Sequence, residues 1–137
     1  MQLQIKEAWI TLISSVLYLV LIHVVAPMMQ SYRAELVLAF LVLHIFTLWL
    51  GRMAIKVSFK ALNEREKAIR FQAAMIATHM MGAVVMLTAI CYYLLYGRAG
   101  MVPLFWVLML AFYTWMSLYI GWSASMLILH KVGLLKL

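Results

Sequence analysis

The sequence predicts an all-α fold, an integral membrane bundle of four transmembrane helices with both termini in the cytoplasm. Hydrophobic residues make up 68% of the 137 residues and gather in four long runs. The chain has four acidic residues, all glutamates, which lie at or near the ends of these runs: Glu7, Glu35, Glu64 and Glu66. Because a charge at the centre of a bilayer costs about 3 kcal/mol, this placement indicates that lipid surrounds the runs.

Four spans and their connections account for nearly the whole chain. A helix needs about 20 residues to cross the hydrocarbon of a bilayer. The predicted spans cover residues 8–27, 35–55, 71–96 and 102–129. No soluble domain fits beside them, so we expect a single transmembrane domain over residues 1–137. The first span is not expected to be a removable signal peptide, because it lacks a small-residue cleavage site and a cationic leader.

Local residues explain where the first two spans begin and end. Trp9 suits a membrane–water interface, and Pro27 suits a helix end because proline interrupts a helix. Glu35 suits the start of the second span, where the helix dipole favours negative charge. Trp49 and Arg52 mark the other boundary of that span.

The pattern predicts that the second and third helices form a hairpin that projects from the membrane. Arg52, Lys56 and Lys60 recur every four residues, which places them on one ridge of a helix that continues beyond the span. Asn63 and Glu66 have the spacing of a capping box, so the third helix should start directly after Asn63. We expect these two helices to be antiparallel neighbours.

Small residues predict where the third and fourth helices pack. Small side chains spaced four apart let helix backbones approach closely in a membrane. The third helix carries one such stripe and the fourth helix another: Ala74, Thr78 and Gly82, and Ser117, Gly121 and Ser125. We expect the two stripes to face each other.

The basic residues predict the orientation of the bundle. The net charge is +7, and most Lys and Arg residues fall before the first span, between the second and third, or after the fourth. By the positive-inside rule, these segments are cytoplasmic. We expect contact with anionic lipids of the inner leaflet, and either a protein partner or a homo-oligomer of the chain. No direct binding of nucleic acid is expected, since no soluble basic module is present.

Two histidines near mid-membrane leave two interpretations open. His44 and His79 lie on the second and third spans, at depths that differ by about one or two helical turns. If they face each other, they are candidate axial ligands for a b-type haem. Otherwise they are neutral histidines hydrogen-bonded within the bundle. We expect no cofactor, with haem b as the alternative.

The sequence offers no set of catalytic residues, and we expect no enzyme. No nucleophile–base pair, phosphate-binding loop or carboxylate pair occurs. Cys91 is the only cysteine, so neither a disulfide nor a thiolate metal site is expected within the chain. The methionines are scattered, without the clustering that a copper conduit needs.

The most distinctive polar segment is the predicted hairpin, which we interpret as a docking surface for a protein partner. Its charged residues are Arg52, Lys56, Lys60, Glu64, Arg65, Glu66, Lys67 and Arg70. A solvated helix start that only fixes topology is the simpler interpretation, and the two are compatible.

At this segment the chain resembles a group of small four-helix membrane proteins of unknown function from bacteria and archaea. These proteins carry an Asp-Glu-Arg-Asp/Glu type loop before an Ala-rich third helix. The matching stretch here is Asn63-Glu64-Arg65-Glu66-Lys67-Ala68-Ile69, with Asn63 in place of the usual Asp. The resemblance implies a non-enzymatic protein of the cytoplasmic membrane that modulates a small helix-turn-helix regulator encoded beside it.

Three functions therefore stand as hypotheses. The leading one is a regulatory or accessory membrane protein that binds a protein partner through the basic hairpin. The second is a haem-bearing electron-transfer subunit. The third is a membrane-embedded immunity protein against a toxin or bacteriocin, which can also be a small bundle without catalytic residues.

Overall fold

The computed structural model describes residues 2–55, 62–97 and 100–132. In this part of the chain every regular element is helical: α1 (Gln2–Val25), the short 3-10 turn η1 (Gln30–Tyr32), α2 (Arg33–Ile55), α3 (Glu64–Tyr96) and α4 (Leu104–Val132). Each of the four α-helices is long and apolar enough to cross a membrane. The prediction of an all-α chain with four such helices is confirmed.

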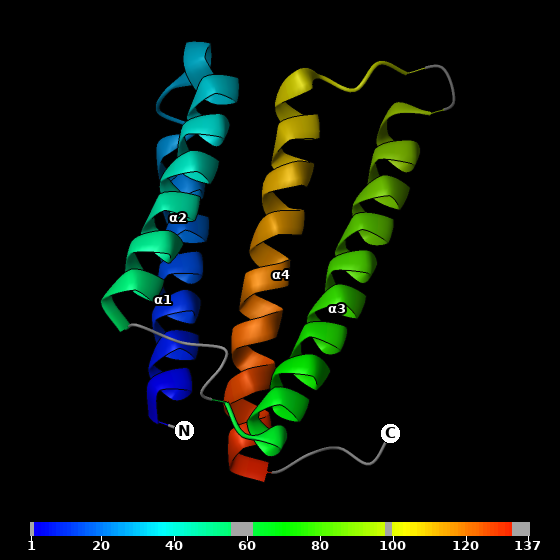
Figure 1. Ribbon diagram of the computed structural model, residues 1–137. Helices are drawn as coiled ribbons and strands as arrows, with labels where there is room; N and C mark the ends of the chain where they lie inside the picture. Colours follow the sequence, from blue (N-terminus) through cyan, green and yellow to red (C-terminus); the bar gives the residue numbers. More distant parts are fainter. Residues whose placement is uncertain (1, 56–61, 98–99, 133–137) are drawn as a thin grey trace.

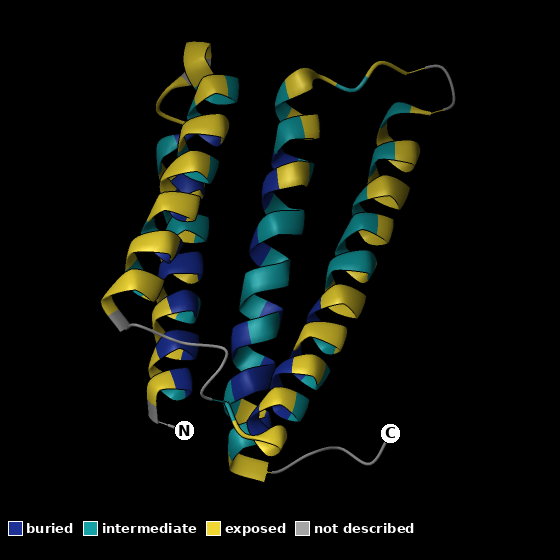
Figure 2. Ribbon diagram, viewed as in Figure 1, coloured by how far each residue is buried: buried dark blue, intermediate teal, exposed yellow. Residues whose placement is uncertain are grey.

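Helix α4 lies at the centre of the bundle (Figure 1). It packs against α1, α2 and α3, and α1 also packs against α2. Figure 2 shows few exposed residues along most of α4, because three helices surround it. In contrast, α2 and α3 lie on opposite sides of α4 and make no backbone contact over the described residues. The expectation that these two helices are packed neighbours is wrong for this part of the chain.

Helix α3 begins where the sequence predicted. Asn63 caps it: the Asn63 side chain accepts a hydrogen bond from the Glu66 backbone N–H at 2.8 Å, and the Asn63 N–H donates to Glu66 Oε2 at 3.1 Å. The helix has 33 residues and is therefore about 50 Å long, against about 30 Å of hydrocarbon. The first turns of α3 thus extend past a membrane-spanning length.

The described basic residues collect mainly at one end of the bundle. The start of α1, the end of α2, the start of α3 and the end of α4 all lie at this end (Figure 1). We call it the basic end, and its described cations are Lys6, Arg52, Arg65, Lys67, Arg70 and Lys131. Arg33 is the described cation at the opposite end. Lys56 and Lys60 lie outside the described residues.

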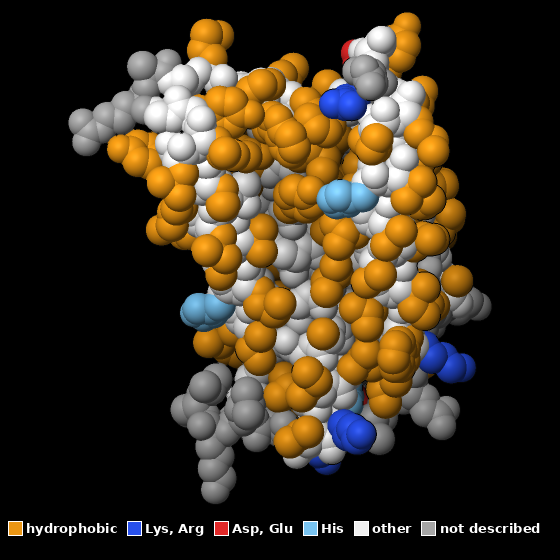
Figure 3. Space-filling view, turned by 180° about the vertical axis from the view of Figure 1, so that it is seen from behind, with side chains coloured by type: hydrophobic (Ala, Val, Ile, Leu, Met, Phe, Trp, Pro, Cys, Tyr) orange, Lys and Arg blue, Asp and Glu red, His pale blue; other side chains and the backbone are white. Residues whose placement is uncertain are grey.

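Two clusters of buried side chains hold the helices together. Towards the opposite end, one cluster joins α1, α2 and α4: Ile22, Ala26, Val37, Met109, Phe112 and Met116. Towards the basic end, the other joins α1, α3 and α4: Ala8, Ile69, Ala73, Met126 and Leu129. The outer faces of the helices are apolar as well, and Figure 3 shows hydrophobic side chains covering the middle of the visible face. Such a surface suits lipid and not water.

Candidate functional site: the basic end

One buried carboxylate ties three helices together at the basic end. Glu7 of α1 is 3% exposed and accepts a hydrogen bond at Oε2 from Nη2 of Arg70, a buried residue of α3. Its other oxygen lies 3.2 Å from Nε of Arg52, on α2. The Arg70 guanidinium also lies 5.7 Å from the ring centre of Trp122 on α4. Because a buried charge is tolerated only with such partners, this cluster fixes the relative positions of all four helices.

A second polar contact joins the first turn of α1 to the last turn of α4. Gln4 is 2% exposed, and its Oε1 lies 3.3 Å from Nε2 of His130. The amide nitrogen of Gln4 is buried and has no hydrogen-bond partner among the described residues. Gln4, like Glu7 and Arg70, is therefore a buried polar residue in a contact between helices.

The outward face of the α3 start carries a different set of charges. Lys67 Nζ lies 2.7 Å from Glu64 Oε1, and both side chains are exposed. Arg65 is exposed between them. Such a surface pair contributes at most about 1 kcal/mol to stability, so these side chains remain available to a partner. We call Glu64, Arg65 and Lys67 the α3 tip.

The structure divides the predicted docking residues into two groups. Arg52 and the α3 tip are exposed. Glu66 and Arg70 are buried, since Glu66 completes the capping box and Arg70 pairs with Glu7, so their assignment to an exposed docking surface is corrected. The predicted positions Lys56 and Lys60 cannot be assigned to either group, because they lie outside the described residues.

His44 belongs to a polar network in the middle of the bundle. Nδ1 of His44 accepts a hydrogen bond from the indole N–H of Trp115 on α4 at 3.0 Å. Since that nitrogen is an acceptor, the ring proton sits on Nε2, which donates to Ser15 Oγ on α1 at 3.0 Å. Tyr18 and Thr47 add a hydrogen bond of 2.9 Å between α1 and α2. His44 is thus a neutral, fully hydrogen-bonded contact between three helices.

His79 lies elsewhere. It is exposed on α3, and its Nδ1 lies 2.7 Å from the carbonyl oxygen of Met75 in the same helix. The structure therefore does not bring His44 and His79 together, and both ring nitrogens of His44 are already hydrogen-bonded. Among the described residues, no three His, Cys, Asp or Glu side chains are grouped as a metal site.

The predicted packing of the third helix against the fourth is confirmed, but the α3 face is not the expected one. Gly121 and Ser125 of α4 are buried, as expected. A Cβ on Gly121 would lie 3.3 Å from the Cα of Ala77, so the helices cross closely there. Ala74 and Thr78 are exposed, and Gly82 has no neighbour near its Cβ position. The contacting α3 face is rotated by one residue, to Ala73 and Ala77.

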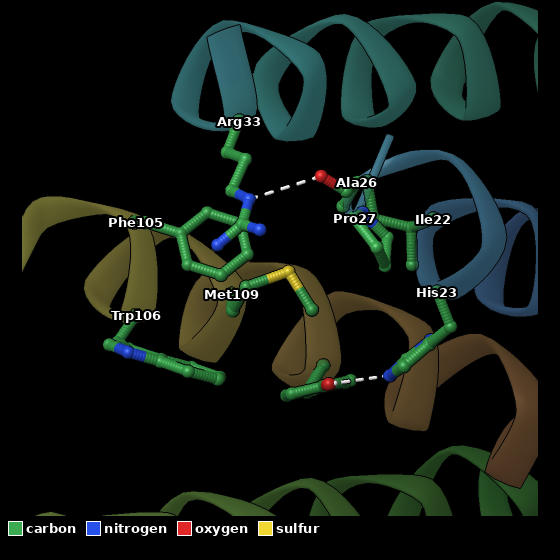
Figure 4. Close-up of a pocket in the computed structure, with 9 residues that line it drawn as sticks. Ile22, His23, Ala26, Pro27, Arg33, Phe105, Trp106 and Met109 are labelled. Carbon is green, nitrogen blue, oxygen red and sulfur yellow. Dashed lines mark hydrogen bonds between the residues drawn. The ribbon is translucent and has the colours of Figure 1, made fainter. Parts of the chain in front are cut away.

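At the opposite end, a pocket of about 200 Å³ lies between α1, α2 and α4 (Figure 4). Arg33 reaches into it from α2, donates from Nε to the Ala26 carbonyl at 3.1 Å, and places its guanidinium 5.7 Å from the ring centre of Phe105. On the α1 side, His23 Nε2 accepts a hydrogen bond from the Tyr113 hydroxyl at 2.7 Å. The other polar atoms of the lining are few, and the pocket is mainly apolar and aromatic.

Sequence reasoning missed the partners of Glu7. Its position beside the first span was clear, but Arg70 lies 63 residues away, on a helix whose rotation an almost uniformly apolar surface does not reveal. The available signal was weak: a carboxylate and an arginine at the same depth on two helices.

The fold and this site define a class of protein: a multi-pass membrane protein of four helices, which a buried ion-pair cluster holds together at one end. Comparisons with protein-family models, with curated proteins and with solved structures give no match.

Proposed function

We propose that the protein is a non-enzymatic regulatory or accessory protein of the cytoplasmic membrane, which binds a protein partner through its basic end. The observation that carries the proposal is the division of charge at the start of α3. Glu66 and Arg70 anchor the helix inward, while Glu64, Arg65 and Lys67 point outward from the same two turns. The anchor holds the tip in place before a partner arrives, which lowers the entropic cost of binding.

The orientation of the bundle supports a cytoplasmic partner. Cations outnumber carboxylates at the basic end, whereas Arg33 and Glu35 are the described charges at the opposite end. By the positive-inside rule, this distribution supports a cytoplasmic location for the α3 tip. An excess of cations favours a partner with an acidic surface, because complementary charges speed association and exclude partners of the wrong charge.

The test is a charge reversal at the tip. The double variant Arg65→Glu, Lys67→Glu is expected to lose its partner during purification from native membranes in mild detergent, because two attractive contacts become repulsive. Lys131→Glu is the control: it reverses one charge of the same sign at an exposed site of the basic end, on α4. The readout is the amount of each co-purifying protein relative to the tagged chain, measured by quantitative mass spectrometry.

Loss of a stoichiometric partner in the double variant, and its retention in the control, are the expected results. Retention in both, or equal loss in both, would contradict docking at the α3 tip. Normal amounts of each variant in the membrane fraction show that insertion is unaffected.

A further inference from the structure

A groove runs between α2 and α3 near the basic end, with α4 as its floor. Three adjoining pockets form it, of about 190, 340 and 200 Å³, and all three include Arg52. On α4, Tyr119 lines the first and the third pocket, and Trp122 lines the first and the second. The groove exists because α2 and α3 pack on opposite sides of α4 and do not contact each other over the described residues.

The end of the groove is cationic. Arg52, Lys67 and Arg70 line it, and the side chains of Arg52 and Lys67 are 59% and 49% exposed. These three cations share the carboxylates of Glu7 and Glu64, which leaves one positive charge in excess. The excess charge at this depth is complementary to an anionic group at the membrane surface.

The rest of the groove is suited to a hydrocarbon chain. Its α3 wall is low, because Ala74 and Thr78 are small, and the Thr78 hydroxyl is satisfied by the Ala74 carbonyl at 2.9 Å. On its floor, Trp115 donates its indole N–H inward to His44. Because both of these polar hydrogens are hydrogen-bonded within the protein, the wall and floor present mainly apolar surface. An acyl chain can cover that surface without breaking a hydrogen bond.

We infer that this groove binds one anionic phospholipid of the adjacent leaflet. The phosphate lies against Arg52 and Lys67, and an acyl chain runs along Ala74, Thr78 and Tyr119. The lipid then bridges two helices that make no backbone contact with each other over the described residues. This site shares Lys67 with the α3 tip, but Arg65 of the tip does not line the groove, and Arg52 and Ala74 of the groove are not part of the tip.

Native mass spectrometry of the purified full-length chain tests the inference. Phosphatidylglycerol is titrated against phosphatidylcholine as the zwitterionic control, and bound lipid is counted per protein. Preferential binding of one phosphatidylglycerol is expected. Arg52→Gln should weaken that binding about fivefold, the effect of one cation near a lipid phosphate. Lys131→Gln, an exposed cation of the same end outside the groove, should leave it unchanged.

A second variant separates the groove from simple surface attraction. Ala74→Phe leaves every charge in place but fills the channel, and Ala74 is exposed, so the fold should tolerate it. We expect reduced phosphatidylglycerol binding. Unchanged binding in Ala74→Phe, or equal effects of Arg52→Gln and Lys131→Gln, would overturn the inference. So would displacement of the lipid by an equal concentration of inorganic phosphate, or a dimer mass without bound lipid, which would place a second copy of the chain in the groove.

Discussion

At the scale of single residues, Glu7 shows how much depends on one carboxylate. It is one of two buried glutamates at the basic end, and two arginines from different helices converge on it. Arg52 remains largely exposed and can be solvated without Glu7, whereas Arg70 is buried. The pairing with Arg70 therefore dominates the contribution of Glu7 to stability.

Removing the charge of Glu7 should be costly. Glu7→Gln leaves the Arg70 charge buried without its carboxylate, and we expect a loss of about 3 kcal/mol in the free energy of unfolding. The measurement is thermal unfolding in detergent, followed by tryptophan fluorescence. Glu64→Gln is the control, because Glu64 also pairs with a cation but its side chain is 90% exposed, so its loss should be small.

A double variant checks the cause. Glu7→Leu combined with Arg70→Met replaces both members of the buried pair with apolar side chains of similar size. It should be more stable than Glu7→Gln, because no unpaired charge remains buried. If the destabilisation of the double variant equalled the sum of those of Glu7→Leu and Arg70→Met measured alone, the ion pair would not be the reason for the loss of stability.

The histidines mark the limit of sequence reasoning at this scale. That His44 lies at mid-membrane could be read from its position in the span. Its hydrogen-bond partners could not be predicted, because Ser15 and Trp115 belong to other helices, and the rotation of those helices decides whether they face His44. Hydrophobic periodicity fixes rotation only where one face is polar, and α2 is apolar on every side.

At the scale of helices, the sequence predicted reliably where a helix begins, but not which face of a helix packs against its neighbour. The Asn63–Glu66 capping box formed as predicted, since all its atoms lie within one turn of the chain. Gly121, the middle residue of the predicted α4 stripe, was also found at the contact with α3. The α3 stripe was wrong by one residue, a rotation of about 100°, because both candidate stripes contain small residues at the same spacing.

The two glycines of these stripes give a matched pair of variants. Gly121→Val should destabilise the bundle by about 1 to 3 kcal/mol, because even a Cβ there lies 3.0 Å from Met80 Sδ and 3.3 Å from Ala77 Cα. Gly82→Ala should be neutral or stabilising, since nothing lies near its Cβ position and alanine favours helix. The measurement is the thermal unfolding of both variants. Equal destabilisation of the two would mean that α3 and α4 do not cross at Gly121.

At the scale of the whole molecule, the number of membrane-spanning helices followed from composition, but their arrangement did not. Helices joined by a short connection usually lie side by side, which is why α2 and α3 were expected to pair. Instead α4, the last helix, packs against all three others. The buried residues of α4 occur on several of its faces, so this helix can pack against more than one neighbour. They include Phe112, Met116, Gly121 and Ser125.

This arrangement connects the two proposals. Because α2 and α3 make no backbone contact over the described residues, a groove remains between them, which we propose for lipid. Because Glu7 of α1 pairs with Arg70 of α3, the start of α3 is fixed relative to α1. The two sites lie at the same end and share Lys67, while Arg65 belongs to the tip alone and Arg52 to the groove.

The most direct test of the central claim is site-specific photo-crosslinking in intact cells of the native host. A photoreactive amino acid replaces Arg65 at the α3 tip, or Lys131 at the end of α4, which is also exposed. We expect a discrete crosslinked protein partner from position 65 and none from position 131. Crosslinking from position 131 alone, or none from position 65, would contradict docking at the tip of α3.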